Sequence, residues 1–346
     1  MAQHQTAEPG NRLNKAQMIH FLQNNSIYMI LFFLVLYIIV REPSFLSIRV
    51  FGQILSQASS RIILALGVAS IIVTGGTDLS AGRSIGMAAV ITASLLQAVG
   101  SPQRIFKGMP ELPIFLPILL AIALCVLFSF VHGIFVAKFK VAPFIASLAI
   151  QLVIYGSMSV YFDAINNGSP IGSLDPVFKS FAQGALDLGF MRIPYLIIYA
   201  TICTLFVWFV WNKTKLGQNM YAIGGNIEAA TVCGVNVARN TLLIYVLAGV
   251  LYGLAGSLEV ARTGSATNSL GSEYALDAIA ACVVGGVSMR GGIGKVQGVV
   301  IGVILFQVVN YGLIYIAVSA YVQYIVRGLI ILLAVTIDTQ KFVKKR

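Results

Sequence analysis

Long apolar segments follow one another along almost the whole of this 346-residue chain, and they constrain its fold more than any other feature. A helix needs about 20 predominantly apolar residues to cross the hydrocarbon core of a bilayer. About ten segments approach this length, at residues 21–40, 55–74, 84–100, 112–137, 141–162, 193–211, 241–260, 272–288, 296–318 and 322–338. Hydrophobic residues make up 58% of the chain and charged residues only 10%, which is unusual for a soluble domain. The sequence therefore predicts an all-α integral membrane protein.

The polar segments are too short to form a separate soluble domain. The longest are residues 163–192 and 212–240, each about 30 residues, well below the usual size of a domain. We therefore predict a tail over residues 1–20, a single transmembrane domain over residues 21–338, and a basic tail over residues 339–346. The segment 21–40 is expected to be a retained first span and not a cleaved signal peptide, because no small-residue cleavage site accompanies it.

The chain has a net charge of +11, and the positions of its basic residues predict how it is oriented in the membrane. Basic residues lie between the apolar segments and not along one soluble face, which argues against a nucleic-acid partner. Lysine and arginine accumulate on the cytoplasmic side of membrane proteins. On this basis we place both termini and the loop 212–240 in the cytoplasm. The basic residues on that side are Arg12, Lys15, Lys138, Lys140, Lys213, Lys215, Arg239, Arg290, Lys295, Lys341, Lys344, Lys345 and Arg346; Arg41, Arg49, Arg61, Arg104, Lys107, Lys179 and Arg192 are placed outside with the loop 163–192.

No set of residues predicts catalysis or metal binding. The four cysteines are scattered, and His132 has no second ligand three or four residues away, so a structural or interfacial role is favoured for it. The pair Gly294-Lys295 is the nearest approach to a phosphate-binding loop, but Met289 stands where that motif needs glycine and Val296 where it needs serine or threonine. We therefore expect neither a metal nor a cofactor on this chain, and no ATP hydrolysis by it alone.

Two glycine-rich segments share the spacing GG-x5-G, at Gly75–Arg83 and Gly285–Gly292. Glycine-interrupted helices at matching places are typical of transporters with duplicated halves. The match favours a duplication of the second to fifth predicted spans as the seventh to tenth. Packing alone is the other explanation, since glycine is frequent in membrane helices.

Polar residues within the predicted spans are candidates for a translocation pathway, because an ionisable group at membrane depth is costly unless it meets a partner or water. These candidates are Asp78, Ser80, Arg83, Glu273, Asp277 and Asn310. An ion pair between Asp78 and Arg83 that holds a broken helix together explains these two residues equally well, and Asn310 also suits a hydrogen bond between helices. Glu259 and Arg262, three residues apart, are expected to form a weak surface pair.

The cytoplasmic segment 222–235 contains a short predicted helix. Gly225-Asn226 is a helix-start signal, the helix is expected from Ile227 to Cys233, and Gly234 ends it. Within it, Glu228-Ala229-Ala230-x3-Gly234 resembles the EAA loop of ABC importer permeases, the coupling helix that docks in a groove of the ATPase subunit. This resemblance predicts that Glu228→Ala or Gly234→Asp leaves the chain inserted but stops uptake.

Other motifs resemble a narrower group, the permeases of ribose, xylose and galactose ABC importers, over nearly the whole chain. They are Leu64-Ala65-Leu66-Gly67-Val68-Ala69, Thr77-Asp78-Leu79-Ser80-Ala81-Gly82-Arg83, Gly264-Ser265-Ala266-Thr267-Asn268 and the run from Leu276 to Gly286. The form with Thr77 and Arg83 is most similar to galactose and methyl-galactoside permeases.

The resemblance implies a pore subunit in the bacterial inner membrane that is not itself an enzyme. Its implied partners are an ATPase subunit that holds ATP and magnesium, a periplasmic sugar-binding protein, a second permease copy, membrane lipid and a monosaccharide. The alternative is an ion-coupled secondary sugar transporter, in which Asp78, Asp277 or His132 relays a proton.

Overall fold

The computed structural model describes residues 29–187 and 192–343, which are mainly helical. The predicted tail over residues 1–20, residues 21–28 of the first span and residues 344–346 of the basic tail lie outside the described residues. The elements are a helix over Met29–Arg41, then η1 Pro43–Leu46, α2 Ile48–Val73, α3 Ala81–Leu95, α4 Phe115–Ala137, α5 Pro143–Asn166, α6 Pro176–Gln183, β1 Ala185–Asp187, β2 Arg192–Pro194, α7 Tyr195–Lys213, α8 Lys215–Gly225, α9 Ile227–Val232, α10 Val237–Thr263, α11 Tyr274–Val284, α12 Val296–Tyr315 and α13 Ala320–Val343.

Seven of the described helices are long and apolar enough to cross a membrane, namely α2, α4, α5, α7, α10, α12 and α13. The described part of the first predicted span and the predicted spans 84–100 and 272–288 contain shorter apolar helices, which are Met29–Arg41, α3 and α11. Both α3 and α11 are short because an irregular segment precedes each of them, over residues 74–80 and 264–273. The predicted spans run past the ends of these two helices, over residues 96–100 and 285–288, because apolar residues and glycine continue beyond the last helical residue.

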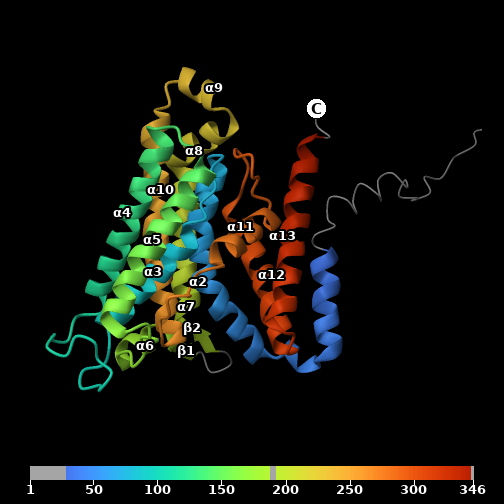
Figure 1. The fold of residues 1–346 in the computed structure, drawn as a ribbon. Helices are drawn as coiled ribbons and strands as arrows, with labels where there is room; N and C mark the ends of the chain where they lie inside the picture. Colours follow the sequence, from blue (N-terminus) through green and yellow to red (C-terminus); the bar gives the residue numbers. More distant parts are fainter. Residues whose placement is uncertain (1–28, 188–191, 344–346) are drawn as a thin grey trace, which may run out of the picture.

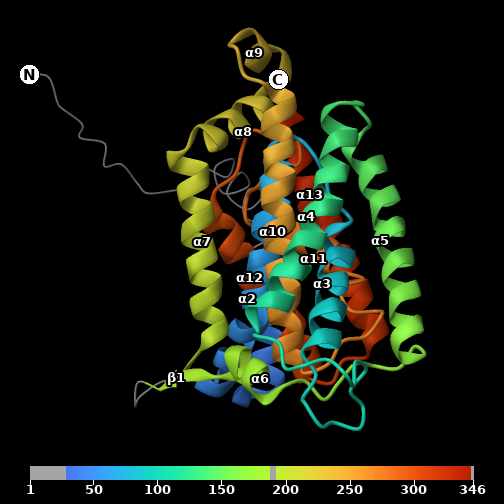
Figure 2. The same ribbon diagram turned by 90° about the vertical axis from the view of Figure 1, so that its left-hand side faces the viewer.

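The long helices form a bundle with α9 at one end and α6, β1 and β2 at the other (Figures 1 and 2). Helix α2 lies at its centre, where 83% of its most apolar 18-residue stretch is buried, and α10 follows with 67%. The same measure is 28% or lower for α4, α5, α7 and α13, which therefore present apolar side chains to the surroundings of the bundle. Such exposure is expected where the surroundings are lipid or another apolar chain.

The predicted charge pattern agrees with the two ends of this bundle, with one exception. The turn between α4 and α5, which carries Lys138 and Lys140, lies at the α9 end (Figure 2). Helix α6 lies at the opposite end; its N-cap Asp175 accepts hydrogen bonds from the backbone of Val177 and Phe178 at 2.7 and 3.1 Å. The exception is Arg61, which was predicted to lie outside but stands within α2, where its guanidinium meets a carboxylate of α11.

The two glycine-rich segments do not occupy corresponding places in the fold. Residues 75–80 connect α2 to α3, whereas residues 285–292 connect α11 to α12. They lie against each other instead, because a β-carbon at Gly291 would lie 2.8 Å from the backbone nitrogen of Gly75. Their shared spacing is therefore not a sign of equivalent positions.

Candidate functional site

Helix α9 projects from one end of the bundle (Figure 1). It begins at Ile227, as predicted, and ends at Val232, one residue earlier than expected. The side chain of its N-cap, Asn226, accepts a hydrogen bond from the backbone of Ala229 at 2.9 Å, which satisfies one of the free amides at the helix start. Glu228 and Ala229 are exposed, whereas Ala230 packs inward.

Gly234 ends this helix in the way that its sequence position predicted. Its φ is +81°, in the left-handed region that glycine adopts without strain. The N–H of Gly234 donates to Thr231 at 2.9 Å, and the N–H of Val235 donates to Ala230 at 3.0 Å. This pair of bonds is the Schellman arrangement, which satisfies carbonyl groups at a helix end. Helix α9 is thus fixed at both ends by its own residues and keeps its exposed face free of intrachain packing.

Directly before α9, three glycines form a main-chain joint that we call the glycine junction: Gly224 of α8 with Gly291 and Gly292 of the α11–α12 connection. A β-carbon at Gly224 would stand 1.8 Å from the carbonyl oxygen of Val73, at the end of α2. A β-carbon at Gly291 would lie 2.8 Å from the backbone nitrogen of Gly75. The glycine junction therefore joins the helix before α9 to α2 and to the segment that follows α2.

A side chain of α8 fastens the same joint. The hydroxyl of Tyr221 donates to the carbonyl of Gly294 at 2.9 Å, and its ring packs edge-on against Trp211, with the ring centroids 5.9 Å apart. Partial burial raises the pKa of Tyr221, which keeps its phenol protonated as a donor.

The segment after α2 is held inside the bundle by Asp78. One carboxylate oxygen, Oδ1, accepts from the backbone N–H and the hydroxyl of Ser80 at 2.8 and 2.6 Å. The other, Oδ2, accepts from the hydroxyl of Tyr252 in α10 at 3.1 Å. The side chain of Asp78 has no exposed surface. Asp78 therefore anchors the non-helical segment to α10, and a solute cannot reach it in this conformation.

His132 of α4 completes this buried group. Its Nδ1 lies 3.7 Å from Oδ1 of Asp78, and its ring packs edge-on against Tyr245 with the centroids 4.5 Å apart. Among the described residues, neither nitrogen of His132 nor the hydroxyl of Tyr245 has a hydrogen-bond partner. His132 is thus buried beside a carboxylate and not interfacial, contrary to one of the two roles favoured from the sequence.

The ion pair considered between Asp78 and Arg83 is not formed, because the two side chains contact different parts of the fold. Arg83 donates from Nη1 to the backbone carbonyl of Asn268 at 3.3 Å. Its guanidinium carbon lies 4.1 Å from the centroid of the Tyr155 ring. Arg83 therefore belongs to a cavity between α3, α5 and the α10–α11 connection.

Three other predicted candidates, Glu273, Asp277 and Asn310, meet around one arginine. Arg327 of α13 donates to Glu273 at 3.0 Å and to the side-chain oxygen of Asn310 at 3.1 Å, and lies 3.9 Å from Asp277. Arg61 donates to the same oxygen of Asp277 at 3.4 Å. We call these five residues the charged cluster; it joins α2, α11, α12 and α13.

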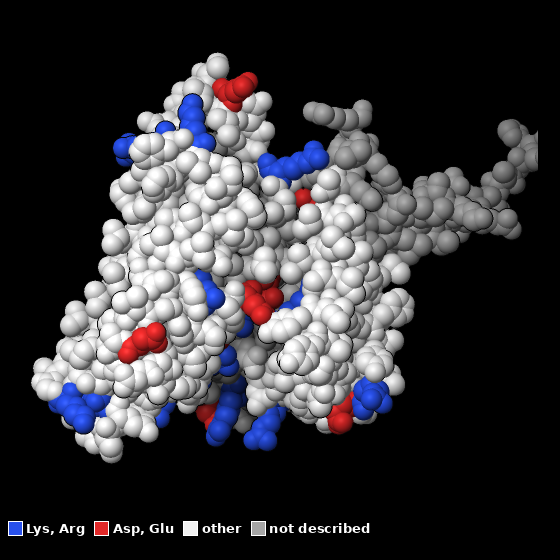
Figure 3. Space-filling model, in the orientation of Figure 1, with Lys and Arg blue, Asp and Glu red and all other residues white. Residues whose placement is uncertain are grey.

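The charged cluster is only partly covered by the rest of the chain. The side chain of Glu273 is 39% exposed, whereas that of Asp277 is 10% exposed. Most charged side chains in the space-filling view lie towards the ends of the molecule, but acidic and basic groups also meet at mid-height in a hollow between two lobes (Figure 3). Partly exposed charges far from the ends of an apolar bundle are typical of a surface that faces water or a partner and not lipid.

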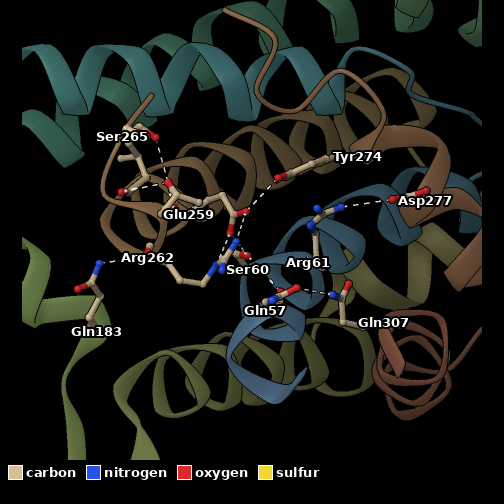
Figure 4. Close-up of polar contacts among 12 residues, drawn as sticks. Gln57, Ser60, Arg61, Gln183, Glu259, Arg262, Ser265, Tyr274, Asp277 and Gln307 are labelled. Carbon is tan, nitrogen blue, oxygen red and sulfur yellow. Dashed lines mark hydrogen bonds and ion pairs between the residues drawn. The ribbon is translucent and has the colours of Figure 1, made fainter. Parts of the chain in front are cut away.

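The expectation of a weak surface pair between Glu259 and Arg262 is wrong. The two side chains do pair, at 2.9 Å, but Glu259 has no exposed surface. It also accepts from the hydroxyls of Ser60 at 2.6 Å and Tyr274 at 3.0 Å (Figure 4). The sequence gives the spacing within α10, but the groups that bury Glu259 come from α2 and α11.

Arg61 and Arg327 were not predicted as parts of this site. A signal was present, because both arginines fall within predicted apolar spans, at residues 55–74 and 322–338. The ring of Tyr274 lies under Arg61, with 3.2 Å between the guanidinium carbon and the ring centroid. Within residues 29–187 and 192–343, no three His, Cys, Asp or Glu side chains gather in a way that suits a metal ion.

Charges that meet inside a bundle of apolar helices, next to irregular segments between those helices, are typical of proteins that move solutes across membranes. The fold and the site together define a membrane permease. Residues 50–335 match the family described as branched-chain amino acid transport system / permease component. The chain belongs to this family.

Individual relatives match almost the entire chain. The galactose/methyl galactoside import permease protein MglC of Haemophilus influenzae is 50% identical over 334 residues, which cover 96% of this chain and 99% of that protein. MglC of Escherichia coli gives the same values. The ribose import permease protein RbsC of Bacillus subtilis is 35% identical over 328 residues, 93% of this chain and 96% of its own. No solved structure matches. These matches give no support to the ion-coupled alternative.

Proposed function

We propose that this chain is the membrane subunit of an ATP-driven importer that carries a monosaccharide across the bacterial inner membrane. Galactose or a methyl galactoside is the preferred substrate and ribose or another pentose the next. The 50% identity to MglC over 99% of its length carries the choice of sugar, and the lower identity of 35% to RbsC sets the order.

The exposed helix α9 is the proposed docking point for a separate ATPase subunit, which holds ATP and magnesium. Glu228 is the exposed charge on this helix, and Ile227 and Val232 add exposed apolar side chains beside it. The glycine junction connects the helix before α9 to α2 by main-chain contact. A displacement of α9 by the ATPase is therefore passed to α2 and to the Asp78 segment, because closely packed main chain has no side-chain rotamers to absorb it.

The proposed topology has ten spans in one permease domain, residues 21–338, with both termini and the loop 212–240 in the cytoplasm and the loop 163–192 in the periplasm. The order of helices supports a duplication. In α2, α3, α4 and α5 a long helix is followed by an irregular segment, a short helix and two long helices, and α10, α11, α12 and α13 repeat this order. A periplasmic sugar-binding protein delivers the sugar, and a second copy of this chain, surrounded by lipid, completes the pore.

The proposed translocation pathway passes Arg83, Glu273, Asp277 and Asn310. The partial exposure of the charged cluster supports this assignment, because charges at membrane depth need water or a partner. Asp78 and Ser80 act on the same pathway indirectly. They do not line it, but their hydrogen bonds fix the segment that leads into α3.

Reconstitution tests the proposal. The chain is purified with its associated proteins, identified by mass spectrometry, and placed in liposomes loaded with ATP. Uptake of labelled galactose that requires ATP, a P-loop ATPase and a sugar-binding protein is the expected result. A chain that purifies alone and whose transport persists without ATP would contradict it.

A further inference from the structure

A cavity of about 310 Å³ lies between α3, α5 and the α10–α11 connection, towards the α6 end of the bundle. The backbone turn at residues 168–170 closes one side of it. The side chains that line it are those of Arg83, Tyr155, Phe162, Thr267, Asn268 and Ser269. Five of these six side chains carry a hydrogen-bonding group. A volume near 300 Å³ is at the lower end for small-molecule sites, which suits one sugar ring better than a larger ligand.

Arg83 brings unused hydrogen-bond donors to this cavity. A guanidinium carries five N–H donors and stays charged. Of these, one bond at 3.3 Å to the carbonyl of Asn268 is made within the described chain, and the buried Nε has no partner there. No described carboxylate lies within ion-pair distance of Arg83. A buried donor without an acceptor is costly, so this cavity favours a ligand rich in acceptor oxygens.

The neighbouring side chains fix both the arginine and an amide. The Tyr155 ring lies 4.1 Å from the guanidinium carbon of Arg83, which holds the guanidinium against α5. The hydroxyl of Ser159 and the side chain of Asn268 are within hydrogen-bond distance, at 3.1 and 3.2 Å. The amide of Asn268 is thereby held at the cavity wall, and it both donates and accepts.

A neutral polyol can use more of the groups in this wall than an anion can. A phosphate or carboxylate accepts hydrogen bonds only, whereas the wall also contains the amide of Asn268 and the hydroxyls of Thr267 and Ser269, which can accept as well as donate. Sugar hydroxyls both donate and accept, and the apolar ring of Phe162 completes a wall suited to the C–H groups of a sugar.

We propose that this cavity is a weak monosaccharide subsite, in which Arg83 and Asn268 hydrogen-bond the sugar while Tyr155 and Ser159 position them. This inference rests on the proposed function and assigns the specificity of the pathway to these residues. A weak site is adequate, because the solute has to leave it at every transport cycle.

Binding to the purified full-length chain in lipid nanodiscs tests the subsite directly. Ligand-observed NMR with D-galactose should give a saturable signal for the unmodified chain, and galacturonate, its anionic analogue, should bind more weakly. Arg83→Gln and Asn268→Ala should each weaken galactose binding about tenfold, the loss expected from a hydrogen bond of about 1.4 kcal/mol. Asn212→Ala is the matched control, because Asn212 lies at the end of α7 next to α8, away from this cavity. This variant should bind like the unmodified chain. Equal galactose binding by all four proteins, or preferred binding of galacturonate, would overturn the proposal.

A labelling experiment keeps the test decisive if a variant fails to fold. Ser269 is an exposed residue of the cavity wall, so Ser269→Cys, in a chain with Cys233→Ser, accepts a maleimide. Galactose should slow this labelling more than galacturonate does, and equal labelling rates with and without galactose would count against the subsite. The two proposals fail differently: absence of ATP-dependent galactose uptake by the unmodified transporter removes the proposed function. Normal uptake with unchanged kinetics in Arg83→Gln and Asn268→Ala removes only the subsite.

Discussion

Gly224 lies so close to the carbonyl oxygen of Val73 that a β-carbon on this glycine would stand 1.8 Å from it. The same carbonyl accepts the backbone N–H of Gly292 at 2.8 Å. The end of α2, the end of α8 and the α11–α12 connection thus meet through main-chain atoms at the glycine junction. Helix α9 starts three residues after Gly224, so the exposed helix and the centre of the bundle are joined over a short distance.

Gly224→Ala is expected to separate α8 from α2 and to lower both stability and uptake. An added methyl group in closely packed surroundings costs about 1–3 kcal/mol, and here the atoms it meets belong to the backbone. The melting temperature of the purified chain and ATP-dependent uptake in liposomes measure the two effects. Gly225→Ala is the matched control, because a β-carbon there has no neighbour within 4 Å. Equal losses in both variants would refute the role of the glycine junction.

Glu228→Ala is expected to leave the fold intact and to reduce uptake at least tenfold. Glu228 is exposed, and the caps of α9 use Asn226 and Gly234, so removal of this side chain leaves the helix in place. The measurements are the melting temperature, the ATPase activity of the assembled complex and its coupling to uptake. Glu111→Ala, an exposed glutamate at the opposite end, should be silent in all three. Normal uptake by Glu228→Ala would remove the docking assignment.

Tyr252→Phe is expected to destabilise the chain, whereas Tyr245→Phe is not. The Tyr252 hydroxyl donates to the buried carboxylate of Asp78, and a hydrogen bond to a charged group contributes about 1.5–3 kcal/mol. The hydroxyl of Tyr245 is equally buried but has no partner among the described residues, so its removal costs little. Melting temperatures of the two variants compare these effects, and a larger loss for Tyr245→Phe would show that Asp78 is held in another way.

Arg327→Met is expected to lower the free energy of unfolding by roughly 2–4 kcal/mol, because Glu273 would lose its arginine and Asp277 would keep only Arg61. The partial exposure of both partners places the loss towards the lower end. The double variant Arg327→Met with Glu273→Gln should recover part of the loss. Arg192→Met provides the comparison, since its pair with Asp187 is largely exposed and such pairs contribute little. Equal melting temperatures for Arg327→Met and Arg192→Met would contradict a stabilising charged cluster.

Local signals predicted the positions of the helices and the form of α9 well. The start of α9 at Ile227 and its end before Gly234 follow from residues next to one another in the chain, which is why the sequence sufficed. The positions of the apolar spans follow from composition in the same way, but their length does not. The irregular segments before α3 and α11 consist mostly of glycine and polar residues, and the contact of Tyr252 with Asp78 holds the first of them against α10.

The partners of the intramembrane charges could not be predicted. An ion pair of Asp78 with Arg83, five residues away, was one of two interpretations, but Asp78 meets Tyr252 and His132 from other helices. Glu259 was expected at the surface because Arg262, three residues away, was its one partner evident from the sequence. Only the fold brings Ser60 of α2 next to it. Helix packing decides which polar groups meet inside an apolar bundle. A single sequence does not show how its helices pack.

The glycine junction also limits how this chain can vary over evolution. An oversized side chain in a core can be accommodated when a neighbouring residue becomes smaller. At Gly224, Gly291 and Gly292, however, every close neighbour of an added β-carbon is a main-chain atom, and a peptide group cannot be made smaller. A second side-chain substitution therefore cannot make room for a first one, and this holds both at Gly224 and at the adjacent pair Gly291 and Gly292, more than sixty residues further along the chain.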